Sequence, residues 1–209
     1  HCGQEILSRT ACEITGRGIT ASFFIGFPAN GRTINALELE KILFDYLPVC
    51  VQKAFFYSST NKKELRNFME LALDQEYIRQ ELLRRKLTAF VADGSILPRE
   101  SGISSRPMKN AIPFSAPESL RISMELPHKG TLTGMGIPQG ITLIVGGGYH
   151  GKSTLLNALE LGVYNHIPGD GREYVITDCT AVKLRSEDGR FIKDVDISLF
   201  INDLPNQKD

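Results

Sequence analysis

Three stretches of the chain predict short strands. Residues 19–27 are rich in β-branched and aromatic residues, and residues 88–92 predict a buried strand. Residues 120–126 alternate apolar and polar residues, which suits a half-buried strand. The dipeptide Asn30-Gly31 tolerates positive φ and therefore predicts a tight turn after the first strand, and Asp93-Gly94 predicts one after the second.

Two further stretches carry apolar residues at helical spacing. Residues 36–56 have this spacing, but Pro48 interrupts it, so we expect two helices or one kinked helix. Asn61 is a suitable N-cap for the next helix, because its side chain can accept from the free amides of the first turn. We expect this helix to bury one apolar stripe and to expose its charged residues. The predicted stripe consists of Leu65, Phe68, Met69, Ala72, Tyr77, Ile78, Leu82 and Leu83.

The segment 98–117 separates two parts of the sequence. It is rich in Pro, Ser and Gly and follows no hydrophobic period, so it predicts a loop or a connection between domains. We therefore divide the chain into an N-terminal α+β region, residues 1–110, and a second domain, residues 111–209.

Composition narrows the classes of protein to consider. The 209 residues include 24 basic and 24 acidic side chains, so no net charge attracts the whole molecule to nucleic acid or to an anionic membrane. No apolar run approaches the ~20 residues that a membrane span needs. The cysteines lack the spacing of a zinc site or of a disulfide framework, so we expect reduced thiols in a cytoplasmic protein. They are Cys2, Cys12, Cys50 and Cys179.

One glycine-rich motif dominates the second half of the sequence. The apolar run 141–145 predicts a buried strand, and it leads directly into Gly-Gly-Gly-Tyr-His-Gly-Lys-Ser-Thr at residues 146–154. This is the G-x-x-x-x-G-K-S spacing of a phosphate-binding loop, which lies between a strand and a helix. Apolar residues from Leu155 to Val163 predict the helix that follows. An idle glycine-rich turn is the alternative, and the flanking strand and helix argue against it.

Each residue type in this motif suits phosphate binding. Glycines let successive amides converge on one anion, and a helix N-terminus adds unpaired amides. Lys152 can reach the β- and γ-phosphates and is the predicted catalytic residue, while the Ser153 hydroxyl is placed to bind Mg²⁺. A catalytic role for His150 is an alternative to the spectator role usual at such variable positions. The predicted binding residues for ATP are Gly146, Gly147, Gly148, Tyr149, His150, Gly151, Lys152, Ser153 and Thr154.

The region after the predicted helix contains few candidates for catalysis. A Pro/Gly turn leads to a strand that ends at Asp178, and a hairpin is expected at 181–197. Asp178 is the only acidic strand end after the loop. We expect it to be a turn aspartate rather than a ligand of Mg²⁺.

Several long strings of the sequence resemble the family of predicted ATPases of the ABC class. The resemblance includes the phosphate loop and extends over nearly the whole chain. It implies an α/β fold with the nucleotide-binding core of a P-loop NTPase of the ABC type, preceded by the N-terminal α+β region. The strings are residues 3–7, 26–32, 90–99, 134–138, 144–156, 162–173 and 187–190.

The resemblance also implies an ATPase that uses ATP and Mg²⁺. Family members carry further sequence on both sides, including a downstream signature segment and an acidic strand end that binds Mg²⁺. We find neither here, so we expect an incomplete core, an internal fragment in which residues 111–209 are the N-terminal half of the ATPase domain. We expect it to bind ATP and to be inactive in hydrolysis alone. Sites of this type are usually completed by a second copy, so we expect the intact protein to form a homodimer.

Two other functions remain open at this point. A nucleic-acid-binding module, switched by the nucleotide, would use a basic cluster within residues 84–109. A small P-loop kinase would need an acceptor site and an arginine-bearing lid, and the sequence after 197 offers neither. The residues of the basic cluster are Arg84, Arg85, Lys86, Arg99, Arg106 and Lys109.

Overall fold

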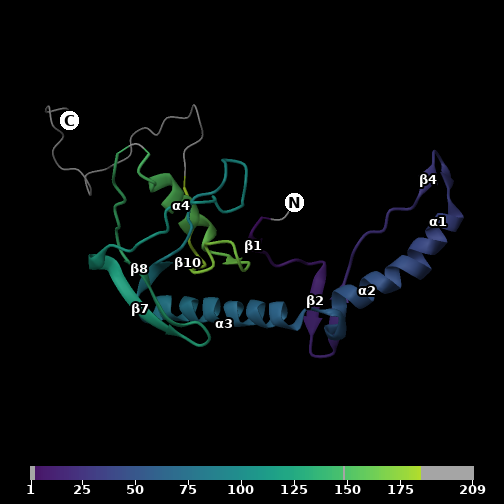
Figure 1. Cartoon of the computed structure of the whole chain (residues 1–209), viewed down its shortest axis with the longest axis horizontal. Coiled ribbons are helices and arrows are strands. Elements are labelled where there is room, and N and C mark those ends of the chain that lie inside the picture. Colours follow the sequence, from purple (N-terminus) through teal and green to yellow (C-terminus); the bar gives the residue numbers. More distant parts are fainter. Residues whose placement is uncertain (1–2, 148, 185–209) are drawn as a thin grey trace.

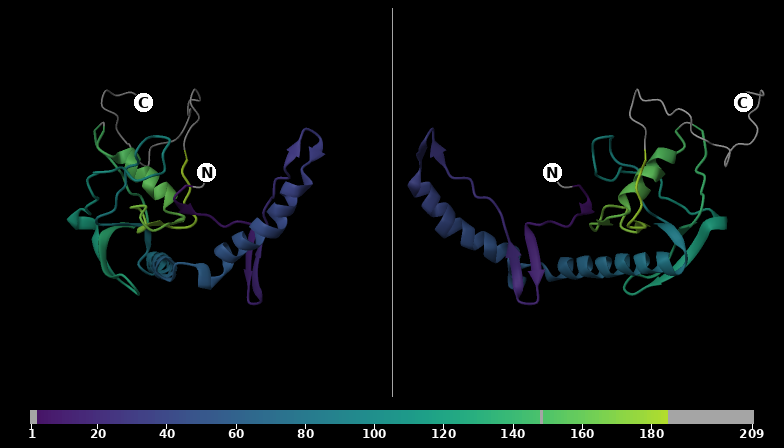
Figure 2. Two further views of the ribbon diagram at one scale, coloured as in Figure 1. Left: turned by 45° about the vertical axis from the view of Figure 1, so that its right-hand side comes forward. Right: turned by 180° about the vertical axis from the view of Figure 1, so that it is seen from behind.

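A computed structural model of the chain describes residues 3–147 and 149–184 (Figure 1). The chain forms a folded body that is built around a small sheet. Residues before about 60 extend away from this body as an arm of hairpins and helices (Figures 1 and 2). The arm and the body differ in burial, since no described residue before Leu71 is buried.

The sheet of the body has four strands in the order β10-β6-β8-β7, and every pairing is antiparallel. Its strands are β6 (Leu87–Ala92), β7 (Arg121–Leu126), β8 (Gly130–Pro138) and β10 (Val175–Thr177). The structure therefore confirms the strands predicted at 88–92 and 120–126. A short 3₁₀ turn, Glu118–Leu120, precedes β7, and residues 98–117 contain only an isolated bridge between Arg99 and Pro107.

Helices cover both faces of this sheet. On one face, helix α3 (Lys62–Arg84) packs Ile78 and Leu82 against Phe90. On the other face, helix α4 (Lys152–Leu161) packs Ala158 against a second apolar cluster that includes Val91. Because neighbouring residues of β6 point to opposite faces, the strand contributes to both clusters. The body is thus three layers, helix on sheet on helix.

Helix α3 begins as predicted but buries a different face. Asn61 caps it by accepting from the amides of Lys63 and Glu64. Ile78 and Leu82 are buried, but the prediction is wrong for Phe68, Met69 and Leu83, which are exposed. Polar residues take part of the buried face because they have polar partners, which come from distant segments for Asp74 and Gln75 and from the end of the helix for Glu81. These buried polar residues are Asp74, Gln75 and Glu81.

The arm is made of short hairpins and one long helical segment. Strand β1 (Glu5–Ile6) pairs with β9 (Asn165–His166) and joins the start of the arm to the body. The other elements of the arm are the hairpin strands β2 (Cys12–Thr15) and β3 (Gly18–Ala21), the hairpin strands β4 (Ala29–Asn30) and β5 (Thr33–Ile34), helices α1 (Ala36–Lys41) and α2 (Leu47–Phe55), and the 3₁₀ turn Tyr57–Ser59.

One prediction for the arm needs correction. The strand predicted at 19–27 ends at Ala21, because only the residues up to Ala21 have a partner in the hairpin. The two helices expected within residues 36–56 are confirmed, since α1 ends at Lys41 and α2 begins at Leu47. A π-helical turn at Ile42–Tyr46 lies between them, and Pro48 lies in the first turn of α2, a position that proline tolerates.

The segment before the phosphate loop also differs from the prediction. Residues 141–147 form no strand, and Ile141, Leu143 and Val145 are exposed. A strand needs a hydrogen-bonded neighbour, and no described segment pairs with this one. The helix predicted after the loop is confirmed as α4. The hairpin predicted at 181–197 lies mostly outside the described residues.

Candidate functional site

The phosphate-loop motif ends in a helix N-terminus that is open to a ligand. Gly151 has a left-handed backbone, with φ of 80°, and α4 starts at the next residue. A glycine adopts this conformation without strain, and it lets the chain turn directly into the helix. No side chain caps the helix, so its first amides lack an intrahelical acceptor and face outward. This arrangement favours an anion at the start of α4.

Lys152 lies over the loop rather than in open solvent. Its Nζ donates to the carbonyl oxygen of Gly146 at 2.6 Å and also to that of Gly147. The ammonium group is thereby held beside the first residues of the motif. A phosphate group bound within the loop would meet this charge directly.

The two side chains in the middle of the motif differ in their surroundings. Tyr149 has a left-handed backbone, with φ of 61°, and its side chain is fully exposed. His150 Nδ1 accepts from the amide of Gly147 at 3.1 Å, so the imidazole contacts the loop backbone. Gly148 lies outside the described residues.

The residues after the lysine fit Mg²⁺ and phosphate by their chemistry. Ser153 is exposed, and within the described part of the chain its hydroxyl has no hydrogen-bond partner. Among residues 3–147 and 149–184 there is no group of three or more His, Cys, Asp or Glu that could hold a metal ion. Mg²⁺ commonly takes few protein ligands together with phosphate oxygens and water, and one hydroxyl suits such a site.

The Asp178 carboxylate forms its hydrogen bonds within its own turn. Its Oδ1 accepts from the amide and the hydroxyl of Thr180, at 2.8 and 2.6 Å. These hydrogen bonds lower the pKa of Asp178 below its ordinary value. The carboxylate therefore acts as the turn aspartate that the sequence predicts.

A second glycine-rich segment, residues 168–173, forms a buried polar cluster that sequence reasoning does not assign to any site. Asp170 is fully buried, and its Oδ2 lies 2.7 Å from His166 Nδ1 and 2.9 Å from Arg99 Nη2. Arg172 is 2% exposed and donates to the carbonyl oxygen of Leu97. The ion pair of Arg99 with Asp170 joins residues that are 71 apart in sequence, so no local pattern could reveal it.

The charges in this cluster perturb one another. Burial alone would raise the pKa of Asp170, but the hydrogen bond from His166 and the charge of Arg99 outweigh it and lower the pKa. Burial and the nearby Arg99 lower the pKa of Arg172 to about 10. Asp170 therefore remains an anion among three basic side chains. It holds the segments together, since its Oδ2 is shared by Arg99 and His166.

Helix α3 is tied to the same region by two polar side chains. Gln75 Nε2 donates to the carbonyl oxygens of His166 and Glu173, at 3.0 and 2.9 Å. Arg79 donates to the carbonyl oxygen of Thr177 at 3.0 Å and to Asn165 Oδ1 at 2.8 Å. These bonds fix the position of the segment that follows α4.

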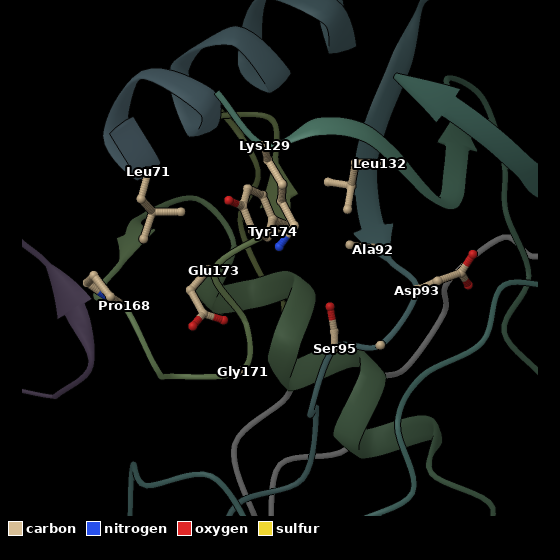
Figure 3. A pocket seen from close by; sticks show the side chains of 11 residues that line it. Leu71, Ala92, Asp93, Ser95, Lys129, Leu132, Pro168, Gly171, Glu173 and Tyr174 are labelled. Carbon is tan, nitrogen blue, oxygen red and sulfur yellow. The ribbon is translucent and has the colours of Figure 1, made fainter. Parts of the chain in front are cut away.

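A separate pocket of about 470 Å³ lies where the turn after β6 meets the segment 168–174 (Figure 3). Its charged side chains already have partners within the protein. Lys129 Nζ lies 4.2 Å from the centre of the Tyr174 ring, and Glu173 accepts from the amide of Gly169. Asp93 accepts from the amide of Ala116 and the hydroxyl of Thr133. No residue of the phosphate-loop motif lines this pocket.

Three of the six residues in the predicted basic cluster form ion pairs. Arg84 and Arg85 both pair with Glu81, at 2.8 and 2.7 Å. Arg99 pairs with Asp170. These pairs reduce the positive charge that the cluster offers to a polyanion.

Comparison with known proteins identifies the class. A family model described as the P-loop domain of the ABC_ATPase family matches residues 61–209, and one described as "ATPase of the ABC class N-terminal" matches residues 1–58. The chain belongs to the family of ABC-class ATPases, and its fold is that of an α/β P-loop protein. The division that we predict at residue 110 stays a prediction.

The chain is also similar to a curated relative, an uncharacterized protein, MJ1628, of Methanocaldococcus jannaschii. The two are 36% identical over 141 residues, which cover 64% of this chain and 31% of the relative. The chain thus matches about a third of that protein's length. In the part of the chain that the structure describes, no helix has the length and apolar character to cross a membrane.

Proposed function

We propose that residues 146–154 bind the triphosphate of ATP together with Mg²⁺. The observation that carries this proposal is the open N-terminus of α4, preceded by left-handed Gly151, with the Lys152 ammonium held over the loop. Backbone amides and one lysine charge in this arrangement suit a polyphosphate. Membership of the ABC-class ATPase family supports the same ligand.

Each part of the motif would have its own role in binding the phosphates and Mg²⁺. The amides from Gly146 to Gly151 surround the phosphates, and Lys152 exchanges its bonds to the loop carbonyls for the β- and γ-phosphates. The Ser153 hydroxyl binds Mg²⁺, and Thr154 meets the next phosphate oxygen. The cation would neutralise charge that develops during phosphoryl transfer. His150 must release the Gly147 amide before that amide can reach a phosphate.

We further propose that hydrolysis needs residues beyond those that bind the phosphates. Phosphoryl transfer requires an acid to hold Mg²⁺ and to position the attacking water. Asp178 is bound to Thr180. The described chain therefore supports binding, and turnover by it alone should remain near background.

The test is a calorimetric titration of the chain with ATP in the presence of Mg²⁺, which measures the affinity for ATP. Lys152→Ala should weaken binding by about 10- to 100-fold, because a charge-assisted contact of ~1.5–3 kcal/mol is lost. Lys183→Ala is the matched control, since Lys183 also contacts α4 but pairs with Glu160, at 2.7 Å. Equal affinity of the wild type and the Lys152→Ala variant would contradict the proposal.

The nucleic-acid-binding module is the weaker alternative. The ion pairs of Arg84, Arg85 and Arg99 disfavour it, and Lys86, Arg106 and Lys109 remain as its candidates. A titration with RNA and DNA at low salt tests it, because binding through phosphates would fall steeply as salt is added. No binding at low salt would remove this alternative.

Two further expectations stay proposals. Dimerisation across the nucleotide would complete the site with residues of a second copy, and light scattering with and without ATP tests it. We also propose a cytoplasmic location, on the expectation that the thiols are reduced. Cys12, Cys50 and Cys179 are free and exposed.

A further inference from the structure

Helix α3 carries an apolar stripe that points away from the body. The stripe consists of Leu65, Met69 and Leu73, which follow one another at intervals of four residues and so lie on one face of the helix. Met69 is 56% exposed and Leu73 is 53% exposed. Ile78, nine residues after Met69, faces about 180° away and packs into the core of the body. The helix therefore presents apolar side chains on two opposite sides, and the body covers one of them.

This stripe begins on the half of α3 that leaves the body. The helix runs from the sheet toward the arm (Figure 1), and its buried residues begin only at Leu71. Other apolar side chains of the arm are exposed as well, so exposure alone assigns no function to the stripe. The stripe is distinguished by the charge at each of its ends.

The two ends of the stripe carry opposite charges. Lys62 lies seven residues before Met69 and Glu76 lies seven residues after it, and both side chains are exposed. Seven residues are close to two helical turns, so both charges lie on the face of the stripe. The order along this face is therefore a cation, the apolar side chains and an anion.

Both charges remain available to a second molecule. Lys62 Nζ lies 5.4 Å from the centre of the Tyr57 ring, which is an aromatic face and not an anion. Glu76 accepts from Gln80 Nε2 at 3.3 Å. The guanidinium of Arg79, the next cation along the helix, donates to oxygens of the segment after α4. A charge of opposite sign can therefore approach the exposed Lys62 and Glu76 side chains.

This order of residues is self-complementary about Met69. Two copies of α3 that lie antiparallel, with Met69 beside Met69, bring Leu65 of each copy to Leu73 of the other. The same arrangement brings Lys62 of each copy to Glu76 of the other, and two-fold symmetry makes every such pair occur twice. Antiparallel helices also place opposite ends of their dipoles side by side.

We propose that a second copy of this chain docks antiparallel on the stripe of α3. Leu65, Met69 and Leu73 form the centre of the interface, and Lys62 and Glu76 pair at its two ends. A partner of uniform charge would meet a like charge at one end of the stripe, whereas a second copy meets an opposite charge at both ends.

The interface is small and does not involve the phosphate loop. It extends over about four helical turns, so we expect a weak dimer with a dissociation constant on the order of 100 µM. The dimer should form without nucleotide. It is therefore separate from dimerisation across the nucleotide and does not depend on the proposed function.

The test is sedimentation equilibrium of the chain without nucleotide. Lys62→Glu and Glu76→Lys should each weaken the dimer by about tenfold or more, because each change sets like charges opposite each other at both ends of the interface. An equal mixture of the two variants should recover the wild-type affinity, since the mixed dimer has opposite charges at both ends. Lys63→Glu is the matched control. It makes the same change at an exposed lysine about 100° around the helix, and it should leave the affinity unchanged.

Met69→Lys tests the centre of the interface. It places two cations side by side on the symmetry axis and should abolish association over the same concentrations. Asn67→Lys is its control, because Asn67 is exposed on the other side of the helix, about 200° around from Met69. Both positions are exposed in the single chain, so both variants should unfold at about the wild-type temperature.

Several results would overturn the proposal. Association that Lys62→Glu and Met69→Lys leave unchanged would mean that another surface forms the dimer. A chain that stays monomeric at several hundred micromolar, or that associates only with ATP, would leave the stripe to another occupant. A mixture of the two charge variants that associates no better than either alone would contradict the antiparallel pairing. None of these results alters the ATP affinity of Lys152→Ala, so failure here is distinguishable from failure of the proposed function.

Discussion

The segments 146–154 and 168–173 share a local pattern and differ in their surroundings. Each contains a glycine with a left-handed backbone followed by a basic residue, Gly151-Lys152 with φ of 80° and Gly171-Arg172 with φ of 78°. Arg172 is buried and bound to the carbonyl oxygen of Leu97. Lys152 contacts only carbonyl oxygens of an exposed loop. Burial thus decides whether the pattern stabilises the fold or remains available to a ligand.

The largest effect on stability is expected at the centre of the buried segment. Asp170→Ala would leave Arg99 and Arg172 without their shared anion in a buried site. Urea denaturation should show a loss of about 3–5 kcal/mol in the free energy of unfolding, the usual cost of breaking a buried ion pair. Asp178→Ala is the control at an exposed turn, with a loss of about 1 kcal/mol. Similar losses in the two variants would break the distinction between the segments.

Alanine at the two left-handed glycines sharpens the comparison. A Cβ on Gly171 would lie 2.8 Å from Ile96 Cβ, whereas a Cβ on Gly151 would meet nothing within 4 Å. Gly171→Ala should therefore cost about 3 kcal/mol, from backbone strain and overpacking together. Gly151→Ala should cost only the strain, about 1 kcal/mol. Thermal unfolding of both variants measures the difference, and equal costs would contradict the packing at Ile96.

The buried anion also predicts a dependence of stability on pH. Because the pKa of Asp170 is lower in the folded protein, the unfolded chain takes up the proton first as the pH falls. The free energy of unfolding should be constant above about pH 4 and should decrease below it, toward the folded pKa. Asp93 and Asp178 also have lowered pKa values and add to the slope. Asp170→Asn should make the slope shallower, and an unchanged slope would exclude Asp170 as a source.

The smallest effect is expected at the half-buried Lys152. Lys152→Ala removes hydrogen bonds that are made only to exposed carbonyl oxygens of the loop. The free energy of unfolding should change by about 0.5 kcal/mol or less, as for most surface substitutions. A loss as large as that of Asp170→Ala would indicate that Lys152 stabilises the fold rather than serving a ligand.

Local patterns in the sequence predict a large part of the body. The cap at Asn61, strands β6 and β7, and helix α4 follow from periodicity and turn chemistry. The buried face of α3 does not, because Asp74 is buried only through the amides of His128 and Lys129, which lie far away in sequence. A prediction from apolar residues alone therefore assigns Phe68, and not Asp74, to the buried face of α3.

For the same reason, the sequence predicts only part of the candidate site. The motif 146–154 predicts the phosphate loop, since its chemistry is local. The segment 108–114 carries no motif, and only the folded chain brings it beside Thr154. The apolar run 141–145 resembles a strand, but a strand is defined by a neighbour, and no described segment supplies one.

The central claim is that the loop 146–154, and not the buried segment 168–173, receives the phosphates. The most direct measurement is a ¹H–¹⁵N NMR titration of the chain with tripolyphosphate and Mg²⁺, which follows each backbone amide. We expect the largest shifts at Gly147 and from Gly151 to Thr154, with the amides of Asp170 to Glu173 nearly unchanged. Largest shifts within 168–173, or an unperturbed loop at saturating ligand, would contradict the claim.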